Sequence, residues 1–142
     1  MNNETIYIES NQSRNLKKIQ SAINKLEDNG GTVHLKKGEH LSGPLTLRTD
    51  VTLYLEKHAL LIFTDEFSQY QPVKTRWEGT ECYALQPMIF AEDSSRIQII
   101  GEGTICGSGK TWWDSYRDLR KGVVTKEVQK VQKRLSILNA SI

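Results

Sequence analysis

The sequence has 142 residues, a length typical of one domain, and its 37% hydrophobic and 25% charged residues are ordinary for a soluble globular protein. A net charge of +2, with no block of five or six like charges, argues against a nucleic-acid partner. No segment approaches the roughly 18 apolar residues of a membrane span, and no signal peptide is visible. We therefore expect a cytoplasmic protein that has no membrane partner.

The two cysteines offer little chemistry. Cys82 and Cys106 lie far apart and lack the Cys-x-x-Cys or Cys/His spacing of a metal site. A disulfide between them cannot be read from the sequence, and buried free thiols are the simpler expectation. We predict no metal and no cofactor.

A helix is predicted over about residues 14–28, followed by short strands. Ser13 is a plausible N-cap, and Gly30 is a plausible C-terminal stop. The apolar positions at helical spacing are Leu16, Ile19, Ile23 and Leu26. Alternating or continuous apolar runs then predict strands at 32–35, 45–47, 51–55, 60–63, 87–91, 97–100 and 103–105. Residues 64–86 show no periodicity and are expected to form a long, irregular excursion.

Two strand blocks resemble each other and suggest a repeat. Val51-Thr52-Leu53 and Ile97-Gln98-Ile99 lie 46 positions apart, which we interpret as two turns of about 23 residues in a solenoid. Alternation within the strands predicts that Val51, Leu53, Leu55, Ile97 and Ile99 face inward. On periodicity alone, a β-sandwich remains an alternative.

The C-terminal part changes character. An amphipathic helix is predicted there, and its narrow apolar seam needs a partner surface, either the β-scaffold or another chain. The seam consists of Val124, Val128, Val131, Leu135 and Leu138.

Several motifs, taken in order, resemble a known family. They are Gly30-Gly31-Thr32-Val33-His34-Leu35, Leu41-Ser42-Gly43-Pro44-Leu45-Thr46-Leu47-Arg48, Thr75-Arg76-Trp77-Glu78-Gly79 with Glu81-Cys82-Tyr83, and 96–109 followed by Trp112-Trp113. This order and spacing is similar to the opening coils of polygalacturonases, the family 28 glycoside hydrolases, and the third motif is similar to a loop of their exo-acting branch. The resemblance runs from about Leu16 to Leu119.

The resemblance implies a mainly β fold, a right-handed parallel β-helix of which only the first coils are present. Residues 1–119 would form N-terminal coils with the helix at 14–28 as a cap, and residues 120–142 an amphipathic helical tail. The sequence departs from the family at Lys36, where a proline is usual, at His58, where a glycine is usual, and at Cys106, where an aspartate is usual. His58 would stand in a turn that favours positive φ, and Cys106 is expected to pack rather than to play a polar role.

Family membership would imply inverting hydrolysis of α-1,4-linked galacturonic acid by paired carboxyl groups. The segments that carry this chemistry in the family, Asn-Thr-Asp, Asp-Asp, Gly-His-Gly and Arg-Ile-Lys, do not occur in this sequence. We therefore predict no catalytic residue, and expect an N-terminal fragment that is inactive alone. The alternative is a non-catalytic carbohydrate-binding or assembly module completed by a separate C-terminal half.

Four residues of the excursion are candidates for substrate binding. Arg76, Trp77, Glu78 and Tyr83 combine a bidentate cationic donor with two aromatic rings, which suits the carboxylates and ring faces of an oligogalacturonide or another acidic polysaccharide. The alternative is that Trp77 anchors the excursion while Arg76 and Glu78 pair locally. Trp112 and Trp113 favour packing roles.

The last coil is expected to leave strand edges open. Such edges favour self-association or pairing with a C-terminal half, unless the helix at 124–138 covers them.

Overall fold

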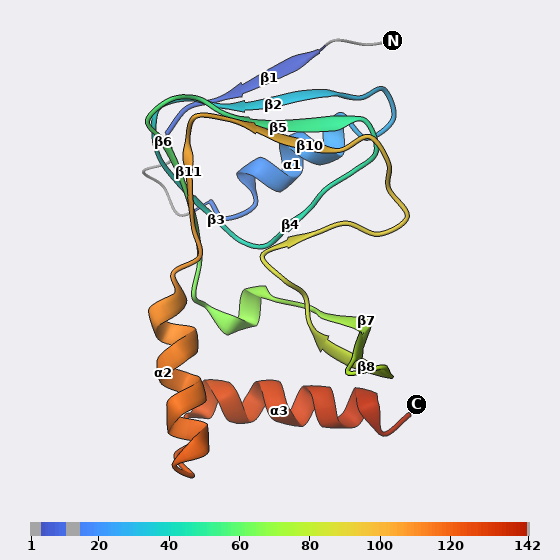
Figure 1. The fold of residues 1–142 in the computed structure, drawn as a ribbon, viewed down its shortest axis with the longest axis vertical. Coiled ribbons are helices and arrows are strands. Elements are labelled where there is room, and N and C mark those ends of the chain that lie inside the picture. The colour runs from blue at the N-terminus through green and yellow to red at the C-terminus, as the bar shows by residue number, and fades with distance from the viewer. Residues whose placement is uncertain (1–3, 11–14, 142) are drawn as a thin grey trace. The chain divides into compact units, whose positions relative to one another are not determined.

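The computed structural model describes residues 4–10 and 15–141 (Figure 1). Contacts divide the chain into two compact units, which are described separately below. Unit 1 comprises Met1–Thr64 and Met88–Gly107, and unit 2 comprises Asp65–Pro87 and Ser108–Ile142. The division into domains at residue 119 stays a prediction.

Unit 1 is built from parallel strands in three sheets. The first sheet has the order β1 (Thr5–Ile8), β2 (Gly31–Leu35), β5 (Val51–Leu55), β10 (Gln98–Gly101). The second has the order β11 (Thr104–Cys106), β6 (Ala59–Phe63), β3 (Gly38–Ser42), and the third pairs β4 (Leu45–Thr46) with β9 (Ile89–Phe90). Every pairing described among these strands is parallel, which excludes the antiparallel β-sandwich (Figure 1).

The coils of unit 1 differ in length. Leu53 pairs with Val33, 20 positions earlier, whereas Ile99 pairs with Leu53, 46 positions earlier. The predicted relation between residues 51 and 97 is therefore real, but the interpretation of 46 residues as two turns is wrong. They form one turn, because the 23 residues of Asp65–Pro87 leave unit 1 within it.

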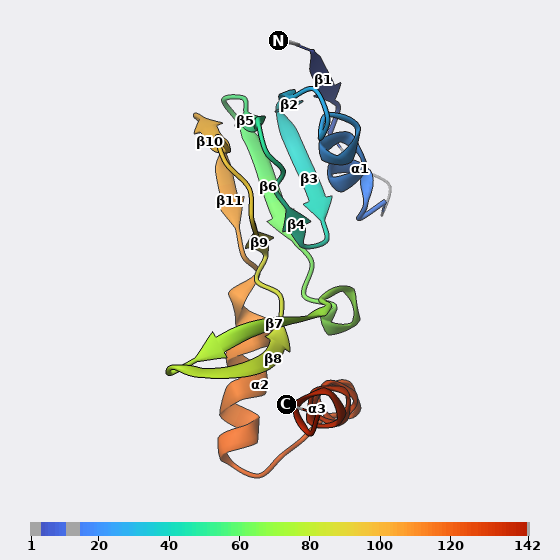
Figure 2. The ribbon, with the colours of Figure 1, turned by 90° about the vertical axis from the view of Figure 1, so that its right-hand side faces the viewer.

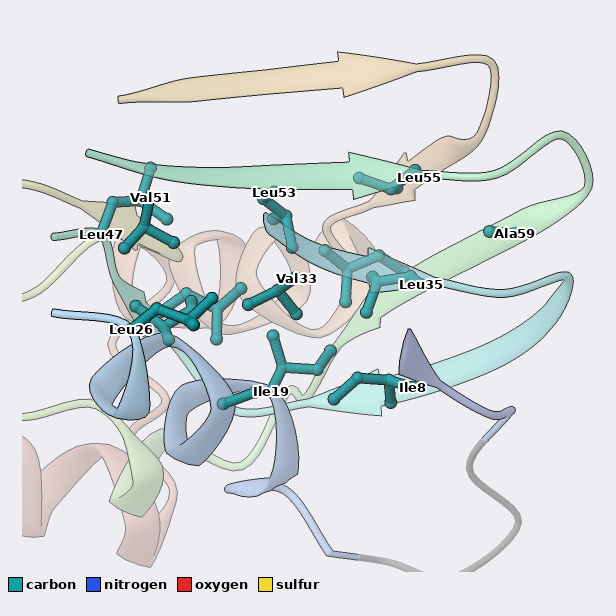
Figure 3. Close-up of a cluster of buried hydrophobic side chains, with 14 of the residues drawn as sticks. Ile8, Ile19, Leu26, Val33, Leu35, Leu47, Val51, Leu53, Leu55 and Ala59 are labelled. Atoms are coloured by element: carbon teal, nitrogen blue, oxygen red, sulfur yellow. The ribbon is translucent and has the colours of Figure 1, made fainter. Parts of the chain in front are cut away.

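Alternate strand residues face the core of unit 1. Val51, Leu53 and Leu55 are buried as predicted, and Figure 3 shows them beside Val33 and Leu35 of the neighbouring strand. Such alternation places every second side chain of a strand on the same side.

The final coil departs from this pattern. Ile97 packs partly against the core, but Ile99 is 41% exposed, so its predicted burial is wrong. Ile99 lies in register with buried Leu53, yet β10 is the outermost described strand of its sheet and no further coil covers it. Ile105, in register with buried Leu61, is likewise 43% exposed.

The predicted capping helix is present but shorter. Helix α1 spans Lys18–Lys25; Ser13 and residue 14 lie outside the described residues. Ile19 and Leu26 point toward the strands in Figure 3, and Ile23 is fully buried. The helix ends at Lys25 with Leu26 as its C-cap, so the predicted stop at Gly30 lies four residues beyond the cap. Gly30, at φ +76°, closes the turn that follows by donating its N–H to the Leu26 carbonyl at 2.7 Å.

The cap also satisfies backbone groups at the edge of the coils. Leu45 and Leu47 donate their N–H groups to the carbonyls of Met88 and Phe90, so the intervening Thr46 presents its backbone groups to the other side. There the Gln20 side chain accepts from the Thr46 N–H at 2.7 Å and donates to the Thr46 carbonyl at 3.0 Å. Helix α1 lies at this end of the stack in Figure 2, with β10 and β11 at the opposite end.

Unit 2 contains a hairpin and two helices. A 3-10 turn, η1 (Phe67–Gln69), precedes β7 (Pro72–Trp77) and β8 (Thr80–Leu85), which pair antiparallel. The prediction of an irregular excursion is therefore wrong for most of this segment. Helix α2 (Gly109–Arg120) was not predicted from the sequence.

The predicted C-terminal helix is confirmed as α3 (Lys126–Asn139), with Thr125 as its N-cap. Val128 is buried, and the other seam residues are half-buried. The helix contacts β8 and η1, so its apolar seam finds its partner within unit 2. No helix among the described residues is long and apolar enough to cross a membrane.

Two single-residue expectations have different outcomes. Cys82 and Cys106 are both free thiols, but Cys82 is only half-buried and Cys106 is exposed, so the expected burial of the thiols is wrong. Cys106 lies on β11, the outermost described strand of its sheet, where nothing packs over it. His58 has φ +69°, as expected for a turn position that usually holds glycine.

We predict that Gln20→Met destabilises the protein. The substitution keeps side-chain length but leaves the Thr46 N–H and C=O without partners, at a cost of about 1–3 kcal/mol. Urea unfolding followed by circular dichroism measures the loss. Gln129→Met, at an exposed position of α3, is the matched control; equal stability of the two variants would contradict a capping role for Gln20.

We predict that His58→Gly stabilises the protein. The left-handed backbone costs a non-glycine residue roughly 1–2 kcal/mol, and glycine's larger unfolded-state entropy offsets part of that gain. The expected net change in unfolding free energy is about +0.5–1 kcal/mol, measured from the urea midpoint. Lys57→Gly, at the neighbouring exposed position without positive φ, is expected to have no stabilising effect.

Candidate functional site

The predicted binding residues lie on the β7–β8 hairpin of unit 2. Trp77 pairs with Thr80, so Glu78 and Gly79 alone form the turn, with φ of +49° and +85°. Two successive residues with positive φ are the pattern of a type I′ turn, whose twist matches that of the flanking strands. The Glu-Gly pair is therefore the sequence signal that could have predicted this hairpin.

The hairpin places three of the four candidates, Trp77, Glu78 and Tyr83, around one open hollow of about 470 Å³ and leaves Arg76 outside its lining. Arg76 and Trp77 are consecutive in a strand, so their side chains point to opposite faces. Tyr83 lies opposite Lys74 and so shares the face of Arg76. Glu78 occupies the turn.

The structure also contradicts the alternative in which Trp77 anchors this segment and Arg76 pairs with Glu78. Trp77 is 71% exposed and anchors nothing. Arg76 donates from Nη2 to the Gly79 carbonyl at 2.9 Å, which braces the turn without engaging Glu78. The tip therefore presents a free indole on one face and a positioned guanidinium on the other.

The outer edge of β8 is held by α3. Asn139 accepts from the Tyr83 N–H at 2.7 Å through Oδ1 and donates from Nδ2 to the Tyr83 carbonyl at 3.1 Å. A side-chain amide thus satisfies both backbone groups that a further strand would pair with. This fixes the hairpin against the C-terminal end of the helix.

Unit 2 also contains a pocket of about 670 Å³ that the sequence did not reveal. Its walls come from η1, the end of β8, one face of α2 and one face of α3. The lining residues are Asp65, Glu66, Phe67, Ser68, Tyr70, Leu85, Thr111, Ser115, Thr125, Glu127, Lys130, Val131 and Arg134. The spacing of 127, 130, 131 and 134 marks one helical face, a signal visible in the sequence once the helix is assigned.

Aromatic packing sets one wall of this pocket. The Trp112 ring lies 4.5 Å from Phe67 and 5.1 Å, edge-on, from Tyr70 (centroid distances). The predicted packing role is thus confirmed for Trp112. It is wrong for Trp113, which is 65% exposed and contacts Tyr116 edge-on at 6.3 Å. The two side chains diverge because consecutive helix residues point in different directions.

Tyr70 is buried beside the pocket in its neutral form. Burial, with a smaller contribution from the negative charge of Asp65, raises the pKa of Tyr70 to about 12. Asp65 itself accepts a hydrogen bond from the Thr111 hydroxyl at 2.6 Å, which joins the start of η1 to α2. The base of the pocket is therefore fixed by side-chain contacts.

Two aspartates outside the pocket lining, Asp50 and Asp114, form ion pairs that hold the fold together. Asp50, at φ +64°, pairs with Arg96, whose hydrogen bond holds the pKa of Asp50 below its usual value. Asp114 accepts from Lys110 at 2.6 Å and from Arg117 at 2.8 Å, and the Lys110 hydrogen bond lowers the pKa of Asp114. Among the residues the structure describes, no group of three His, Cys, Asp or Glu side chains could hold a metal ion.

Comparisons with known proteins agree with this fold. No family model matches the chain. In sequence it is 28% identical over 115 residues to a probable polygalacturonase of Vitis vinifera, covering 74% of this chain and 23% of that protein. The described chain thus spans about a quarter of that relative's length.

Two solved structures share the fold. A hyperthermoactive exopolygalacturonase from Thermotoga maritima matches with a TM-score of 0.74 and 23% identity, over 96% of this chain and 33% of that one. A family 28 exopolygalacturonase of Yersinia enterocolitica matches with a TM-score of 0.62 and 24% identity, over 73% of this chain and 20% of that one.

Unit 1 is thus made of coils of a right-handed parallel β-helix, as predicted. The chain is polygalacturonase-like in sequence as well as in fold, which confirms the resemblance carried by its motifs.

We predict that Asn139→Leu loosens the hairpin. Because the Tyr83 N–H and C=O lose their partners, amide exchange at Tyr83 is expected to accelerate by about ten-fold or more. NMR-detected hydrogen exchange measures the rate. Gln132→Leu, at an exposed position of the same helix, should leave it unchanged, and equal rates in both variants would contradict the bracing role.

Proposed function

We propose that this chain supplies the capped end of a polygalacturonase-like β-helix, together with a substrate-contacting hairpin, and hydrolyses nothing by itself. The observation that carries the proposal is the state of its carboxyl groups. Every described carboxyl with a shifted pKa has it lowered, namely Asp50, Glu56 and Asp114.

An inverting hydrolase needs a different arrangement. One carboxylic acid must hold its proton near neutral pH, which requires a raised pKa, and a second carboxylate must activate water from the opposite face. In Glu56, a hydrogen bond from the Lys37 N–H at 2.8 Å and another contact with His34 at 3.0 Å favour the charged form. Such a carboxylate is a structural anion and a poor proton donor.

The hairpin tip supports a role in contacting an acidic polysaccharide. An exposed indole suits the apolar face of a sugar ring, and a guanidinium suits its carboxylate. Because Trp77 and Arg76 point to opposite faces, we propose that they engage different sugar residues or opposite sides of one strand of substrate. Tyr83 and Glu78 would contribute at the Arg76 face and at the turn.

The exposed end of unit 1 supports a role in assembly. Ile99 and Ile105 stand in register with fully buried leucines but are themselves 41% and 43% exposed. We propose that further parallel coils, in the same protein or in a separate chain, pair with β10 and β11 and bury these residues. Self-association through the same edges would satisfy the same groups.

We predict that the purified chain releases no reducing ends from polygalacturonate above a buffer control. Reducing-sugar assays between pH 4 and pH 8 measure this, because the hydrogen bonds that lower the pKa of the three carboxyl groups named above favour their charged forms. Release that scales with protein concentration and survives repurification would overturn the proposal.

A further inference from the structure

We propose that the pocket of unit 2 binds a small sugar that carries a single anionic group, a carboxylate or a phosphate. The site is separate from the hairpin tip and draws its lining from η1, Tyr70, Leu85, α2 and α3. It lies entirely within one compact unit.

The size of the pocket fits a small ligand. Its volume of about 670 Å³ falls inside the range of roughly 300–1,000 Å³ that is typical of small-molecule sites. Its base is fixed by the Asp65–Thr111 hydrogen bond and by the packing of Phe67 and Tyr70 on Trp112. A cavity with a fixed base needs little reorganisation when a ligand enters.

Two cations on α3 provide the anion site. Lys130 and Arg134 are one helical turn apart and line the same wall. Arg134 donates from Nη2 to Gln71 Oε1 at 2.6 Å, which positions the guanidinium and leaves its other donors available. Lys130 has no hydrogen bond or ion pair to any residue the structure describes, so its ammonium is free to bind an anion.

The carboxylates of the pocket limit the ligand's charge and call for hydroxyl donors. Asp65, Glu66 and Glu127 also line it, so a polyanion would meet repulsion. Carboxylates accept hydrogen bonds only, and a sugar supplies the hydroxyl groups to donate them. A ligand with a single anionic group can bind the two cations through that group, and its hydroxyl groups can donate hydrogen bonds to the carboxylates.

Apolar and hydroxyl groups complete the match to a sugar. Phe67, Leu85 and Val131 offer apolar surface for the C–H face of a ring. Ser68 and Ser115 offer hydroxyls that both donate and accept. Neutral Tyr70 adds an aromatic ring without adding charge.

Isothermal titration calorimetry of the full chain tests the proposal with three probes: galacturonate, galactose 6-phosphate and galactose. Galacturonate or galactose 6-phosphate is expected to bind at least about ten-fold more tightly than galactose, since hydrogen bonds to a charged group are stronger than those between neutral groups. Preference between the two charged probes identifies the anionic group. Equal binding of all three, or no binding up to about 10 mM, overturns the proposal.

Variants of α3 locate the site. Lys130→Met and Arg134→Gln are expected to weaken binding of the charged probe about ten-fold or more. Lys133→Met removes the same charge from an exposed position outside the pocket and should leave the affinity unchanged. Equal losses in Lys130→Met and Lys133→Met would show a nonspecific charge effect and refute the site. Circular dichroism confirms that the variants fold.

The outcome is independent of the function proposed above. The predicted absence of hydrolysis depends on the carboxyl groups of the chain. The proposed role of the hairpin depends on Trp77 and Arg76. Neither proposal involves Lys130 or Arg134, the cations of the pocket. A failed titration with an inactive chain would therefore refute only the pocket, and a positive titration with release of reducing ends would refute only the proposed inactivity.

Discussion

The unpaired backbone at the edge of a strand is the constraint on which this structure depends. In a parallel coil stack, the N–H and C=O groups of each strand are satisfied by the coil before and the coil after, so the two ends of the stack cannot satisfy themselves. At one end, β1 pairs with β2, the Leu16 carbonyl accepts from the Gly43 N–H at 2.9 Å, and Gln20 bonds both backbone groups of Thr46. At the other end, the structure describes no equivalent cover over β10 and β11.

A side-chain amide serves the same purpose in both units. Gln20 of α1 bonds the edge of β4, and Asn139 of α3 bonds the edge of β8, each accepting from an N–H and donating to a C=O of one residue. A side-chain amide resembles a peptide group, with a carbonyl oxygen that accepts and an NH₂ group that donates. It can therefore form the two hydrogen bonds that a neighbouring strand would otherwise make with an edge residue. A helix bearing one such residue ends a sheet without adding a strand.

The sequence predicted the parts of this fold that depend on local periodicity and failed where tertiary context decides. The cap, the burial of Val51, Leu53 and Leu55, and α3 follow from spacing of apolar residues. Helix α2 was not predicted, because the resemblance assigned residues 109–119 to the coils and Trp112 and Trp113 to packing roles. The substrate-binding role of Arg76 and Trp77 stays a prediction, although strand alternation places the two side chains on opposite faces. The hairpin was not predicted because its strands are largely exposed and so lack a regular apolar pattern. The pocket could not be predicted because its walls come from separate segments that only the folded chain unites.

The unequal coils have a consequence for the order in which the protein assembles. The pairing of β2 with β5 closes a separation of 20 residues, whereas that of β5 with β10 closes 46, slightly more than a doubling. Each doubling of a flexible loop adds only about 0.6 kcal/mol of closure entropy, so the insertion costs the native state little. It does make the last coil the most non-local contact in unit 1, and non-local contacts form slowly. Folding should therefore start at the capped end and reach β10 and β11 last. The exposed strand edge that could pair with another chain then forms only after the rest of the stack has folded.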